Sequence, residues 1–346
     1  MRVAVVEKKG GPLVMEERPV PEPGPREVRI KVHACGVCHS DQFIVDAIWP
    51  GLSLPRVPGH EVAGVVDKLG PEVRGVKTGQ RVGVGWYGGH CGVCSACREG
   101  DFILCENPRI AGLTHDGGYA EYMIASADSL AFIPDNIPLP EAAPLLCAGL
   151  TTFNALRNSG ARAGDLVAVQ GVGGLGHLGI QFARAMGFHV VAVSRSGEKA
   201  GEAQKLGAHD FVDTTKGDPA GALRKLGGAR VILATAVSGH ATSTLIEGLG
   251  RNGCLMLLAG SPDSVSVKPG FFIAGRRRVQ GWSSGQASDS TDTLRFAAQA
   301  NIRPLIEAFP LDQANDAYQK MIQGKVRYRA VLRMAETSPS TETTAR

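Results

Sequence analysis

The sequence predicts an α/β protein in which a mostly-β, loop-rich domain is followed by a doubly wound parallel sheet. Three observations support this prediction. Short runs of β-branched residues, separated by Gly and Pro, dominate residues 1–150. Strand-like and helix-like segments then alternate over residues 151–287. At the start of that alternation, a G-x-G-x-x-G turn joins a strand to a helix.

The first domain contains strand-like runs whose apolar residues do not follow a helical spacing. Helical periodicity starts only after Pro140, which favours a mostly-β architecture up to that point. The expected strands are Arg2–Val6, Val28–Val32, Val62–Val66 and Arg81–Val84.

The second domain is organised around residues 165–196. The apolar run Leu166–Val169 predicts a strand that is buried on both faces. A helix follows, in which apolar residues recur at helical spacing until Gly187 ends it, and Val190–Val193 reads as the next parallel strand. Strand, glycine turn, helix and strand in this order form a βαβ unit.

The glycine turn of this unit has the pattern of a dinucleotide-binding fingerprint. Gly171 permits the tight turn, Gly173 lets the backbone approach a pyrophosphate, and Gly176 lets helix and strand pack closely. Gly174 and Leu175 complete the turn, and the helix N-terminus offers free N–H groups to the phosphates. Glycine turns without a ligand are common, but here all four elements follow in order.

The end of the second strand bears on which nicotinamide cofactor is bound. This segment, Ser194-Arg195-Ser196, has no carboxylate, the group that accepts hydrogen bonds from the ribose of NAD. An arginine there accommodates the 2′-phosphate of NADP, and serine hydroxyls add further donors. We therefore expect NADP(H). A solvated arginine between two turn serines is the alternative interpretation.

The rest of the chain continues the alternation and then changes character. Three more strands are expected in the doubly wound sheet: Asp210–Val212, Arg230–Ala234 and Cys254–Ala259. They are followed by two helices and a last strand: Asp289–Ala300, Leu311–Gln323 and Tyr328–Arg333. Residues 336–346 have the composition of a flexible tail.

Composition argues against several classes of function. The chain has 346 residues, a formal net charge of +4 and no basic run longer than Arg276–Arg278, so charge does not indicate nucleic-acid binding. It contains no 18-residue apolar stretch and no apolar region of a signal peptide, so we expect no membrane segment and a cytoplasmic location. In such a compartment the eight cysteines are better explained as metal ligands than as disulfides.

Cysteine and histidine residues scattered through the first domain suggest a catalytic metal. Cys35 and Cys38 form a C-x-x-C pair, His60 lies in Pro-Gly-His-Glu, and Cys147 comes much later. A catalytic zinc needs about three protein ligands and an open position, and Cys38, His60 and Cys147 can supply such a Cys₂His set. A redox dithiol is the alternative for the C-x-x-C pair, but the thioredoxin-like context is absent.

A second metal site is indicated by four closely spaced cysteines, Cys91, Cys94, Cys97 and Cys105. Thiolates interleaved with small residues are typical of a closed tetrahedral zinc site, which stabilises a segment without a core of its own. A ferredoxin cluster is disfavoured, because the last gap is seven residues rather than three. A zinc knuckle for nucleic acid is disfavoured, because clustered basic or aromatic residues are lacking.

The motifs GVCHSD, GHE, the four-cysteine segment, CAGLTT and GVGGLG, in this order, resemble those of the zinc-dependent medium-chain alcohol dehydrogenases. The resemblance covers residues 1–335, and such an ordered set is highly specific. It implies a GroES-like catalytic domain over 1–150, a Rossmann cofactor domain over 151–287 and a return to the catalytic domain over 288–335. It also implies a homodimer or homotetramer that pairs through the apolar strand Val279–Trp282.

The resemblance implies roles for residues around the Cys₂His set, whose members would be the catalytic zinc ligands. Glu61 would be a nearby carboxylate that sometimes enters the coordination sphere. Asp41 would hydrogen-bond the far nitrogen of His60 and fix its tautomer. Ser40 would contact the substrate oxygen and pass its proton outward.

The resemblance also implies contacts to the cofactor. Thr151 matches a position near the nicotinamide. His39 and Arg329 match positions near the pyrophosphate, and a solvated surface cation is the alternative for both.

One departure from the family pattern concerns the proton relay. Many members carry a histidine three residues after the position of Ser40, whereas this chain has Phe43, so the proton would leave through ribose and water or through another group. Four aromatic residues are candidates for an apolar substrate pocket by family position, with plain core packing as the alternative. They are Phe43, Trp49, Trp86 and Tyr87.

The activity implied by the resemblance is hydride transfer between a nicotinamide cofactor and an alcohol or aldehyde, with zinc as the Lewis acid that lowers the pKa of the alcohol. Arg195 favours NADP(H) as that cofactor, and the aromatic pocket candidates suggest a primary, aromatic alcohol or aldehyde. An NAD-linked alcohol or polyol dehydrogenase is the nearest alternative. Zinc-free quinone and enoyl reductases do not need the Cys₂His set or the four cysteines. A non-catalytic zinc- and nucleotide-binding protein would keep the motifs without turnover.

Overall fold

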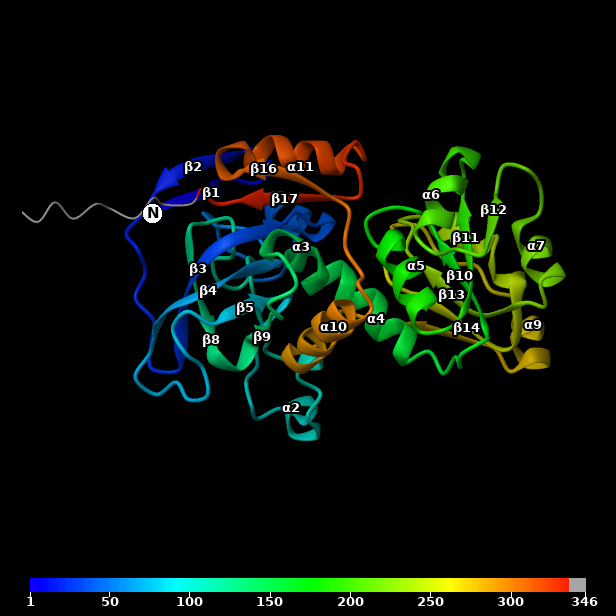
Figure 1. The fold of residues 1–346 in the computed structure, drawn as a ribbon, viewed down its shortest axis with the longest axis horizontal. Helices are drawn as coiled ribbons and strands as arrows, with labels where there is room; N and C mark the ends of the chain where they lie inside the picture. The colour runs from blue at the N-terminus through cyan, green and yellow to red at the C-terminus, as the bar shows by residue number, and fades with distance from the viewer. Residues whose placement is uncertain (336–346) are drawn as a thin grey trace, which may run out of the picture. The chain divides into compact units, whose positions relative to one another are not determined.

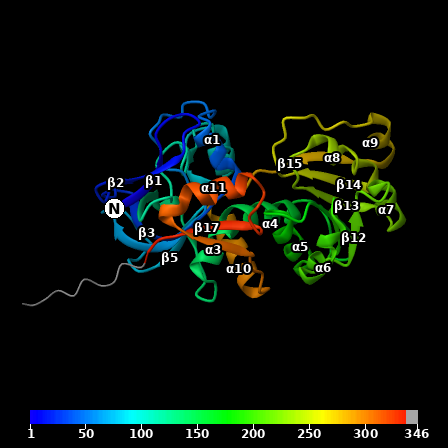
Figure 2. The ribbon, with the colours of Figure 1, turned by 90° about the horizontal axis from the view of Figure 1, so that it is seen from above.

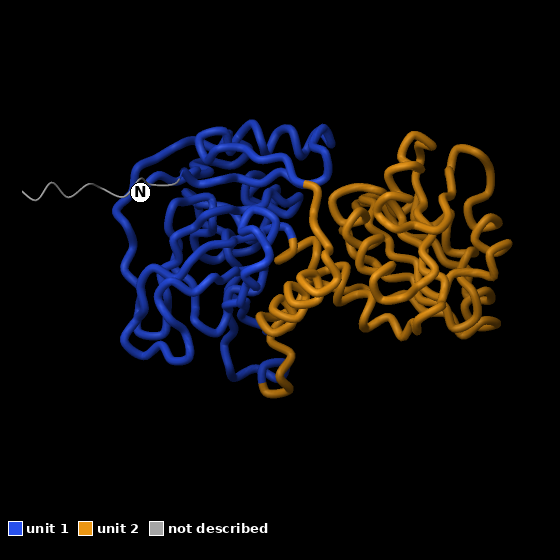
Figure 3. The backbone as a smooth tube through the Cα atoms, viewed as in Figure 1, with its two compact units in different colours: residues 1–97, 105–144, 306–346 blue, residues 98–104, 145–305 orange. Residues whose placement is uncertain are grey.

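The computed structural model describes residues 1–335, so the expected tail at 336–346 lies outside the described residues. Contacts divide the chain into two units (Figure 3). Unit 1 comprises residues 1–97, 105–144 and the segment from 306 onward, and unit 2 comprises residues 98–104 and 145–305.

The last boundary lies at 305/306, whereas the sequence analysis expected the return to begin at 288. Helix α10 (Ala287–Gln299) accounts for the difference, because it packs on α4 (Leu150–Arg157) within unit 2. The rings of Phe296 and Phe153 lie 5.2 Å apart, an aromatic contact that holds the two helices together.

Unit 1 is built on a seven-stranded sheet in which β8 (Tyr122–Ser126) pairs with β3 (Glu27–Gly36) beside the main path. Side chains alternate between buried and partly exposed along most of β3, as expected for a sheet with one face on the core. The main path runs in the order β16 (Ile306–Pro310), β17 (Arg329–Arg333), β3, β4 (Val62–Leu69), β5 (Arg81–Val84) and β9 (Ala131–Phe132).

The C-terminal segment returns to this sheet. Strand β17 pairs antiparallel with β3, so that Val331 lies opposite Gly36, and it pairs parallel with β16. Figure 1 shows β17 and α11 (Ala314–Ile322), both at the red end of the colour scale, beside the blue N-terminal strands. The chain after residue 305 therefore completes the same sheet that the N-terminal half begins.

Shorter elements complete unit 1. Two small antiparallel pairs flank the main sheet: β1 (Arg2–Val6) with β2 (Leu13–Glu17), and β6 (Tyr87–Gly89) with β7 (Arg109–Ile110). The helical elements are η1 (His39–Asp41), α1 (Gln42–Val45), α2 (Ser95–Glu99), η3 (Ala127–Ser129), α3 (Leu139–Pro144) and η7 (Leu311–Gln313). Several of these pieces are too short to carry a periodic signal in the sequence, which is why the sequence analysis did not anticipate them.

Unit 2 contains a six-stranded, all-parallel sheet. Every residue of β10 is buried, as a strand covered on both faces requires. The order is β12 (Asp210–Asp213), β11 (His189–Ser194), β10 (Leu166–Gln170), β13 (Ala229–Ala234), β14 (Leu249–Leu257) and β15 (Arg278–Gly281).

Helices cover both faces of this sheet. Figure 2 shows α5 (Gly176–Ala185) and α6 (Ala200–Lys205) on one side, with α8 (Gly239–Ser243) and α9 (Pro269–Gly275) on the other. The remaining helical elements of unit 2 are η2 (Phe102–Leu104), η4 (Leu145–Gly149), η5 (Gly197–Lys199), α7 (Pro219–Lys225) and η6 (Ile246–Gly248). The α/β class and the doubly wound parallel sheet are thus confirmed.

The strand order of unit 2 also locates its binding edge. The chain moves from β10 to β11 on one side and later to β13 on the other, so the order reverses beside β10. Ligands of doubly wound sheets bind at the carboxyl ends of the strands at such a reversal. Within residues 1–335, no helix has both the length and the apolarity needed to cross a bilayer.

A partly buried histidine, His115, gives the fold a pH dependence. The side chain of His115 packs against Gly88, and its Nδ1 lies 3.2 Å from the hydroxyl of Thr114. Burial, followed by the positive charges of Arg109 and Arg56, lowers the pKa of His115 to about 4. The unfolded chain has an ordinary histidine pKa near 6.5, so it binds this proton at a higher pH than the native protein does.

We therefore expect the free energy of unfolding to fall by about 2–3 kcal/mol between pH 6.5 and 4 through His115 alone. The contribution is fully present above pH 6.5 and is lost as the pH drops through that window. In His115→Gln, the difference between the urea midpoints at pH 7 and pH 4.5 should shrink. The exposed His240 provides the control, since His240→Gln should keep the wild-type difference. A His115→Gln variant with an unchanged difference would contradict the assignment.

Candidate active site

Four potential ligands from distant parts of the sequence meet in one cluster: Cys38, His60, Glu61 and Cys147. Their ligand atoms all lie within 4.8 Å of one another. Cys38 directly precedes η1, and Glu61 directly precedes β4. Cys147 lies in η4, a π-helical segment that continues α3 without a break, and such π-bulges often mark functional sites.

The side chain of His60 fits a metal ligand. It is fully buried, and its Nδ1 lies 3.4 Å from Oδ1 of Asp41. Its Nε2 is also buried and has no hydrogen-bond partner among residues 1–335. A buried ring nitrogen in this state is costly unless it binds something. Two cysteines beside such an imidazole form the donor set that zinc prefers.

Asp41 connects this imidazole to the backbone of a second ligand. The carboxylate is buried, and its Oδ2 accepts hydrogen bonds from the backbone N–H of Cys38 at 2.9 Å and from the hydroxyl of Tyr119 at 2.8 Å. A carboxylate behind a metal-bound histidine fixes the ring and its tautomer. The tautomer is assigned here from these contacts: with Nδ1 facing Asp41, Nε2 is the nitrogen left for a metal.

Glu61 is the second buried carboxylate of the cluster. Burial raises its pKa to about 7, although the neighbouring Arg329 guanidinium acts in the opposite direction. One carboxylate oxygen, Oε1, accepts a hydrogen bond from Arg329 at the start of β17. The other, Oε2, has no partner among the described residues. Glu61 can therefore turn an oxygen to a cation without losing its arginine contact.

Gly36 makes the contact between Glu61 and Arg329 possible. A Cβ at position 36 would lie 1.9 Å from Oε2 of Glu61, so no side chain fits there. The family resemblance implies that Arg329 lies near a pyrophosphate, and an exposed cation is the alternative. In the structure the residue is only 5% exposed and is paired with Glu61. His39 is exposed, as a solvated cation would be.

Three of the four pocket candidates form a row of aromatic rings that ends at His60. The ring of Trp86 lies 5.1 Å from that of His60 in an edge contact. Trp49 follows at 5.8 Å from Trp86, and Phe43 at 5.7 Å from Trp49. All three side chains are only partly buried. They form an apolar surface next to the candidate metal ligands, and the partly exposed Ser40 lies three residues before Phe43, in η1.

Tyr87 is not part of this row. Its hydroxyl hydrogen-bonds Nδ1 of His90, the rings of these two residues stack at 6.0 Å, and the side chain is buried. Burial, followed by the charges of Asp128, Cys97 and Cys105, raises the pKa of Tyr87. Trp86 therefore contacts His60, whereas Tyr87 contacts His90 and lies close enough to Cys97 and Cys105 to feel their charge.

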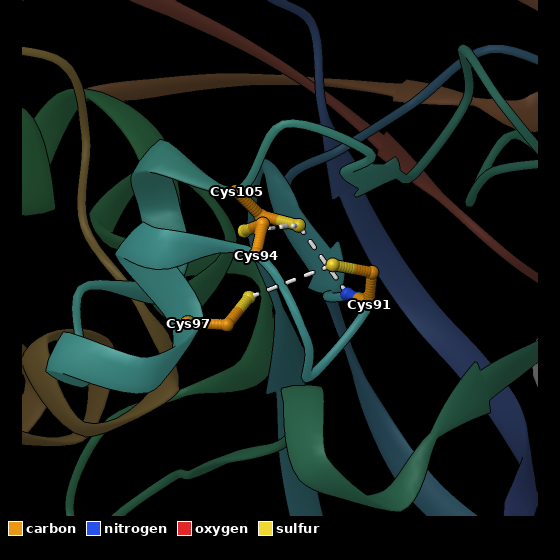
Figure 4. A group of neighbouring side chains, drawn as sticks. All are labelled: Cys91, Cys94, Cys97 and Cys105. Carbon is orange, nitrogen blue, oxygen red and sulfur yellow. Dashed lines mark hydrogen bonds between the residues drawn. The ribbon is translucent and has the colours of Figure 1, made fainter.

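The four-cysteine segment brings its sulfurs together, with all four Sγ atoms within 4.8 Å of one another (Figure 4). Cys91 Sγ lies 3.9 Å from Cys97 Sγ, and Cys94 Sγ lies 4.0 Å from Cys105 Sγ. A tetrahedral zinc with Zn–S bonds of about 2.3 Å holds its sulfurs about 3.8 Å apart. The spacing therefore fits a closed ZnS₄ site.

Backbone amides around these sulfurs favour thiolates. Cys105 Sγ accepts hydrogen bonds from the N–H groups of Cys91 and Asn107, at 3.3 and 3.4 Å. Bonds from the N–H groups of Val93 and Cys94 lower the pKa of Cys91 to about 6. The thiolate is the form that binds a metal, so the backbone prepares the site for zinc.

Cys94→Ser should remove the metal of this segment while leaving the other cluster intact. We expect one zinc ion per chain instead of two, faster proteolysis within residues 91–105, and a thermal midpoint lower by roughly 5–10 °C. The lower thermal midpoint corresponds to a free energy of unfolding that is smaller by about 2–3 kcal/mol. Metal analysis, limited proteolysis and calorimetry measure these effects, and Ser95→Ala at the neighbouring position, the first residue of α2, is the control. A fully stable variant that had lost turnover would contradict a structural role.

The glycine turn of unit 2 has the geometry that a dinucleotide requires. Gly171 has a φ of +90°, and a Cβ at Gly176 would lie 1.7 Å from the carbonyl oxygen of Gly171. A Cβ at Gly173 would meet nothing within 4 Å, so space for a ligand opens beside the backbone there. The buried His177 supports the turn, with its Nδ1 at 2.9 Å from the carbonyl oxygen of Gly173.

A second cation, Lys199, lies near the end of β11 in addition to Arg195. Ser194 and Ser196 are partly exposed and Arg195 is exposed. Lys199 Nζ donates a hydrogen bond to the carbonyl oxygen of Val172 in the glycine turn, at 3.0 Å. Lys199 follows Arg195 by four residues, and a motif search restricted to the strand end misses it.

A carboxylate of the neighbouring strand lies beside the end of β11. Asp213 lies opposite Ser194 in the register of β11 and β12. Its Oδ1 accepts hydrogen bonds from the backbone N–H and the hydroxyl of Thr215, at 3.0 and 2.6 Å. Its Oδ2 lies 3.8 Å from Lys216 Nζ. Thr151, expected near the nicotinamide, is buried in α4.

Two family models match the chain, one in its N-terminal part and one in the part that contains the parallel sheet. Residues 24–135 match the family model of the alcohol dehydrogenase GroES-like domain, and residues 174–299 match that of the zinc-binding dehydrogenases. The chain is 46% identical to alcohol dehydrogenase notN of Aspergillus sp. (strain MF297-2) over 333 residues, which cover 96% of this chain and 97% of the relative.

Solved structures give a concordant result. A cinnamyl alcohol dehydrogenase of Sorghum bicolor superposes with a TM-score of 0.88 at 30% identity, covering 97% of this chain and 99% of that one. A structure described as an NAD-dependent alcohol dehydrogenase superposes with a TM-score of 0.90 at 30% identity, covering 97% of this chain and 100% of that one.

Proposed function

Since the chain belongs to the zinc-dependent medium-chain alcohol dehydrogenase family, we propose that it transfers hydride between a primary, aromatic alcohol and NADP(H). The chain is an oxidoreductase with a small-molecule substrate, as its relatives are alcohol dehydrogenases over their full length. The substrate class, the choice of cofactor and the residue roles are the proposed parts.

The observation that carries the proposal is the cluster of Cys38, His60, Glu61 and Cys147. Two thiolates and an imidazole would hold the zinc, which when bound polarises the substrate oxygen and lowers the pKa of an alcohol so that a nicotinamide can accept its hydride. The cysteines supply negative charge that offsets the cation. The buried Asp41 holds the imidazole of His60. Glu61, paired with Arg329, can bind the zinc in place of another ligand while substrate and product exchange.

Proton movement is assigned to Ser40. Ser40 lies in η1, two residues after Cys38 and three before Phe43 of the aromatic row, and it is partly exposed. The Oγ atom would accept the proton of the alcohol and pass it towards solvent. Position 43, where many relatives have an imidazole, holds a phenyl ring here, so the outward path from Ser40 runs through water or the cofactor ribose.

An aromatic substrate is favoured by the row formed by Phe43, Trp49 and Trp86. These rings provide an apolar surface that starts beside His60. Aromatic rings stack edge-to-face or offset on such a surface with about 0.5–1.5 kcal/mol beyond the burial of area. The structural similarity to a cinnamyl alcohol dehydrogenase supports the same substrate class.

NADP(H) is favoured over NAD(H) by the charges at the end of β11. Arg195 and Lys199 are available to a 2′-phosphate, with Ser194 and Ser196 as hydroxyl donors. The carboxylate of Asp213, on the neighbouring strand, already accepts two hydrogen bonds from Thr215. NAD(H) stays the alternative, because one similar structure is described as NAD-dependent.

Subunit pairing through β15 is part of the proposal. This strand is an edge of the six-stranded sheet, and Val279 in it is 40% exposed. An edge strand with exposed apolar side chains can continue its sheet into a second copy. Sedimentation analysis should therefore give a dimer or a tetramer.

The decisive experiment combines turnover with metal content. Aromatic and aliphatic aldehydes are reduced with NADPH and with NADH, before and after treatment with a chelator, and zinc per chain is measured. We expect two zinc ions, highest kcat/KM with an aromatic aldehyde and NADPH, and loss of activity with loss of one ion. Full turnover without zinc would favour a zinc-free reductase, and zinc and nucleotide binding without turnover would favour a non-catalytic protein.

A further inference from the structure

The phenol of Tyr119 lies behind the candidate zinc centre, and none of the roles above uses it. Its side chain is fully buried, and its hydroxyl donates a hydrogen bond of 2.8 Å to Oδ2 of Asp41. The same oxygen accepts the backbone N–H of Cys38 at 2.9 Å. Two donors thus fix one oxygen of a carboxylate that water does not reach.

The other oxygen of Asp41 is thereby directed at a metal ligand. Oδ1 lies 3.4 Å from Nδ1 of His60. One carboxylate therefore contacts the backbone of the ligand Cys38 and the ring of the ligand His60. Without the hydroxyl, the Cys38 N–H would be the one remaining hydrogen bond to Oδ2 within residues 1–335, and Oδ1 would be held less firmly towards the imidazole.

The ring of Tyr119 is anchored to the loop that carries His60. Gly59 has a φ of +103°, and a Cβ there would lie 2.5 Å from Cδ1 of Tyr119. The backbone N–H of Tyr119 donates to the carbonyl oxygen of Pro58 at 3.0 Å, and that of Gly118 donates to the carbonyl oxygen of Gly59 at 2.9 Å. The phenol is thus placed by the residues directly before the ligand.

We propose that Tyr119 is a positioning residue for the catalytic zinc, acting through Asp41 to hold His60 and Cys38 in place. The inference rests on the zinc centre proposed above. Loss of a hydrogen bond to a metal ligand typically lowers metal affinity about 10–100-fold. Tyr119 bonds to Asp41 and not to a ligand side chain itself, so we expect an effect near tenfold. The effect should be confined to this centre, because the four-cysteine segment has its own amide donors.

The test measures metal release. Wild type, Tyr119→Phe and Tyr122→Phe are loaded with cobalt(II), and the visible absorption and the rate of removal by a chelator are recorded. Tyr122→Phe serves as the matched control, because it removes a hydroxyl from β8, three residues after Tyr119 in the chain. In Tyr119→Phe we expect the metal of the catalytic centre to leave about tenfold faster with an altered spectrum, while the ZnS₄-type site and the control stay at wild-type values. The thermal midpoint should fall by only a few degrees, because one buried hydrogen bond is lost.

The Asp41→Asn background shows whether Tyr119 acts through Asp41. Adding Tyr119→Phe to it should change the release rate by less than about twofold, because the partner charge is already gone. Equal acceleration at both sites, an unchanged release rate in Tyr119→Phe, or a full additional effect in Asp41→Asn would each overturn the inference. A wild-type protein that holds only one metal ion would instead refute the proposed zinc centre itself.

Discussion

Replacing Cys147 with alanine is expected to lower kcat/KM by at least about 100-fold and to reduce the zinc content from two ions per chain to one. The sulfur of Cys147 lies within 4.8 Å of the ligand atoms of Cys38, His60 and Glu61. Without it, the remaining donors supply only one thiolate and one imidazole, plus a carboxylate that already pairs with Arg329. The cation would be held weakly and in another geometry.

Cys254→Ala is the matched control for this experiment. Cys254 is a fully buried cysteine of β14 that belongs to neither metal cluster of the described chain. Its removal should cost some stability while leaving both zinc ions and turnover in place. Metal analysis, steady-state kinetics and calorimetry on the two variants separate loss of a ligand from loss of packing. Wild-type turnover in Cys147→Ala would remove this residue from the site.

Replacing Arg195 with aspartate should weaken NADPH binding by about 2–3 kcal/mol, or roughly 30–150-fold, and NADH binding much less. The substitution removes a charged donor from the expected 2′-phosphate position and adds a repelling carboxylate. Lys199 and the two serines stay, so binding is weakened rather than abolished. Calorimetric titration of both cofactors measures the two affinities separately.

Arg251→Asp makes the same change of charge elsewhere on unit 2. Arg251 is exposed near the start of β14, whereas cofactors bind at the carboxyl ends of the strands. This control should alter both affinities by less than about twofold, through long-range charge alone. If the wild-type protein binds NADH more tightly than NADPH, the assignment of Arg195 is wrong.

The local motifs were predictable from the sequence because each depends on closely spaced residues. The glycine turn requires Gly171 and Gly176, whose close approach leaves no room for a side chain at position 176. The four cysteines lie within fifteen residues, so one short loop can bring their sulfurs together. The doubly wound sheet followed from apolar runs that alternate with helical spacing.

Assembly of the site depended on contacts between distant segments, which leave no periodic signal in the sequence. Sequence position alone did not show that Arg329 lies against Glu61, because this pairing needs β17 beside β3 and a glycine at position 36. Nor did it separate Trp86 from Tyr87, although the ring of Trp86 contacts His60 and that of Tyr87 stacks on His90.

The sequence by itself determined the two candidate metal-ligand sets, the dinucleotide turn and the class of fold, since local spacing limits what those residues can form. Only the tertiary structure decided which buried groups stand behind the ligands, Tyr119 and Asp41 behind His60 and Arg329 behind Glu61. The physical reason is that a buried polar group must find its partner wherever folding places one, and that partner need not be near in the chain.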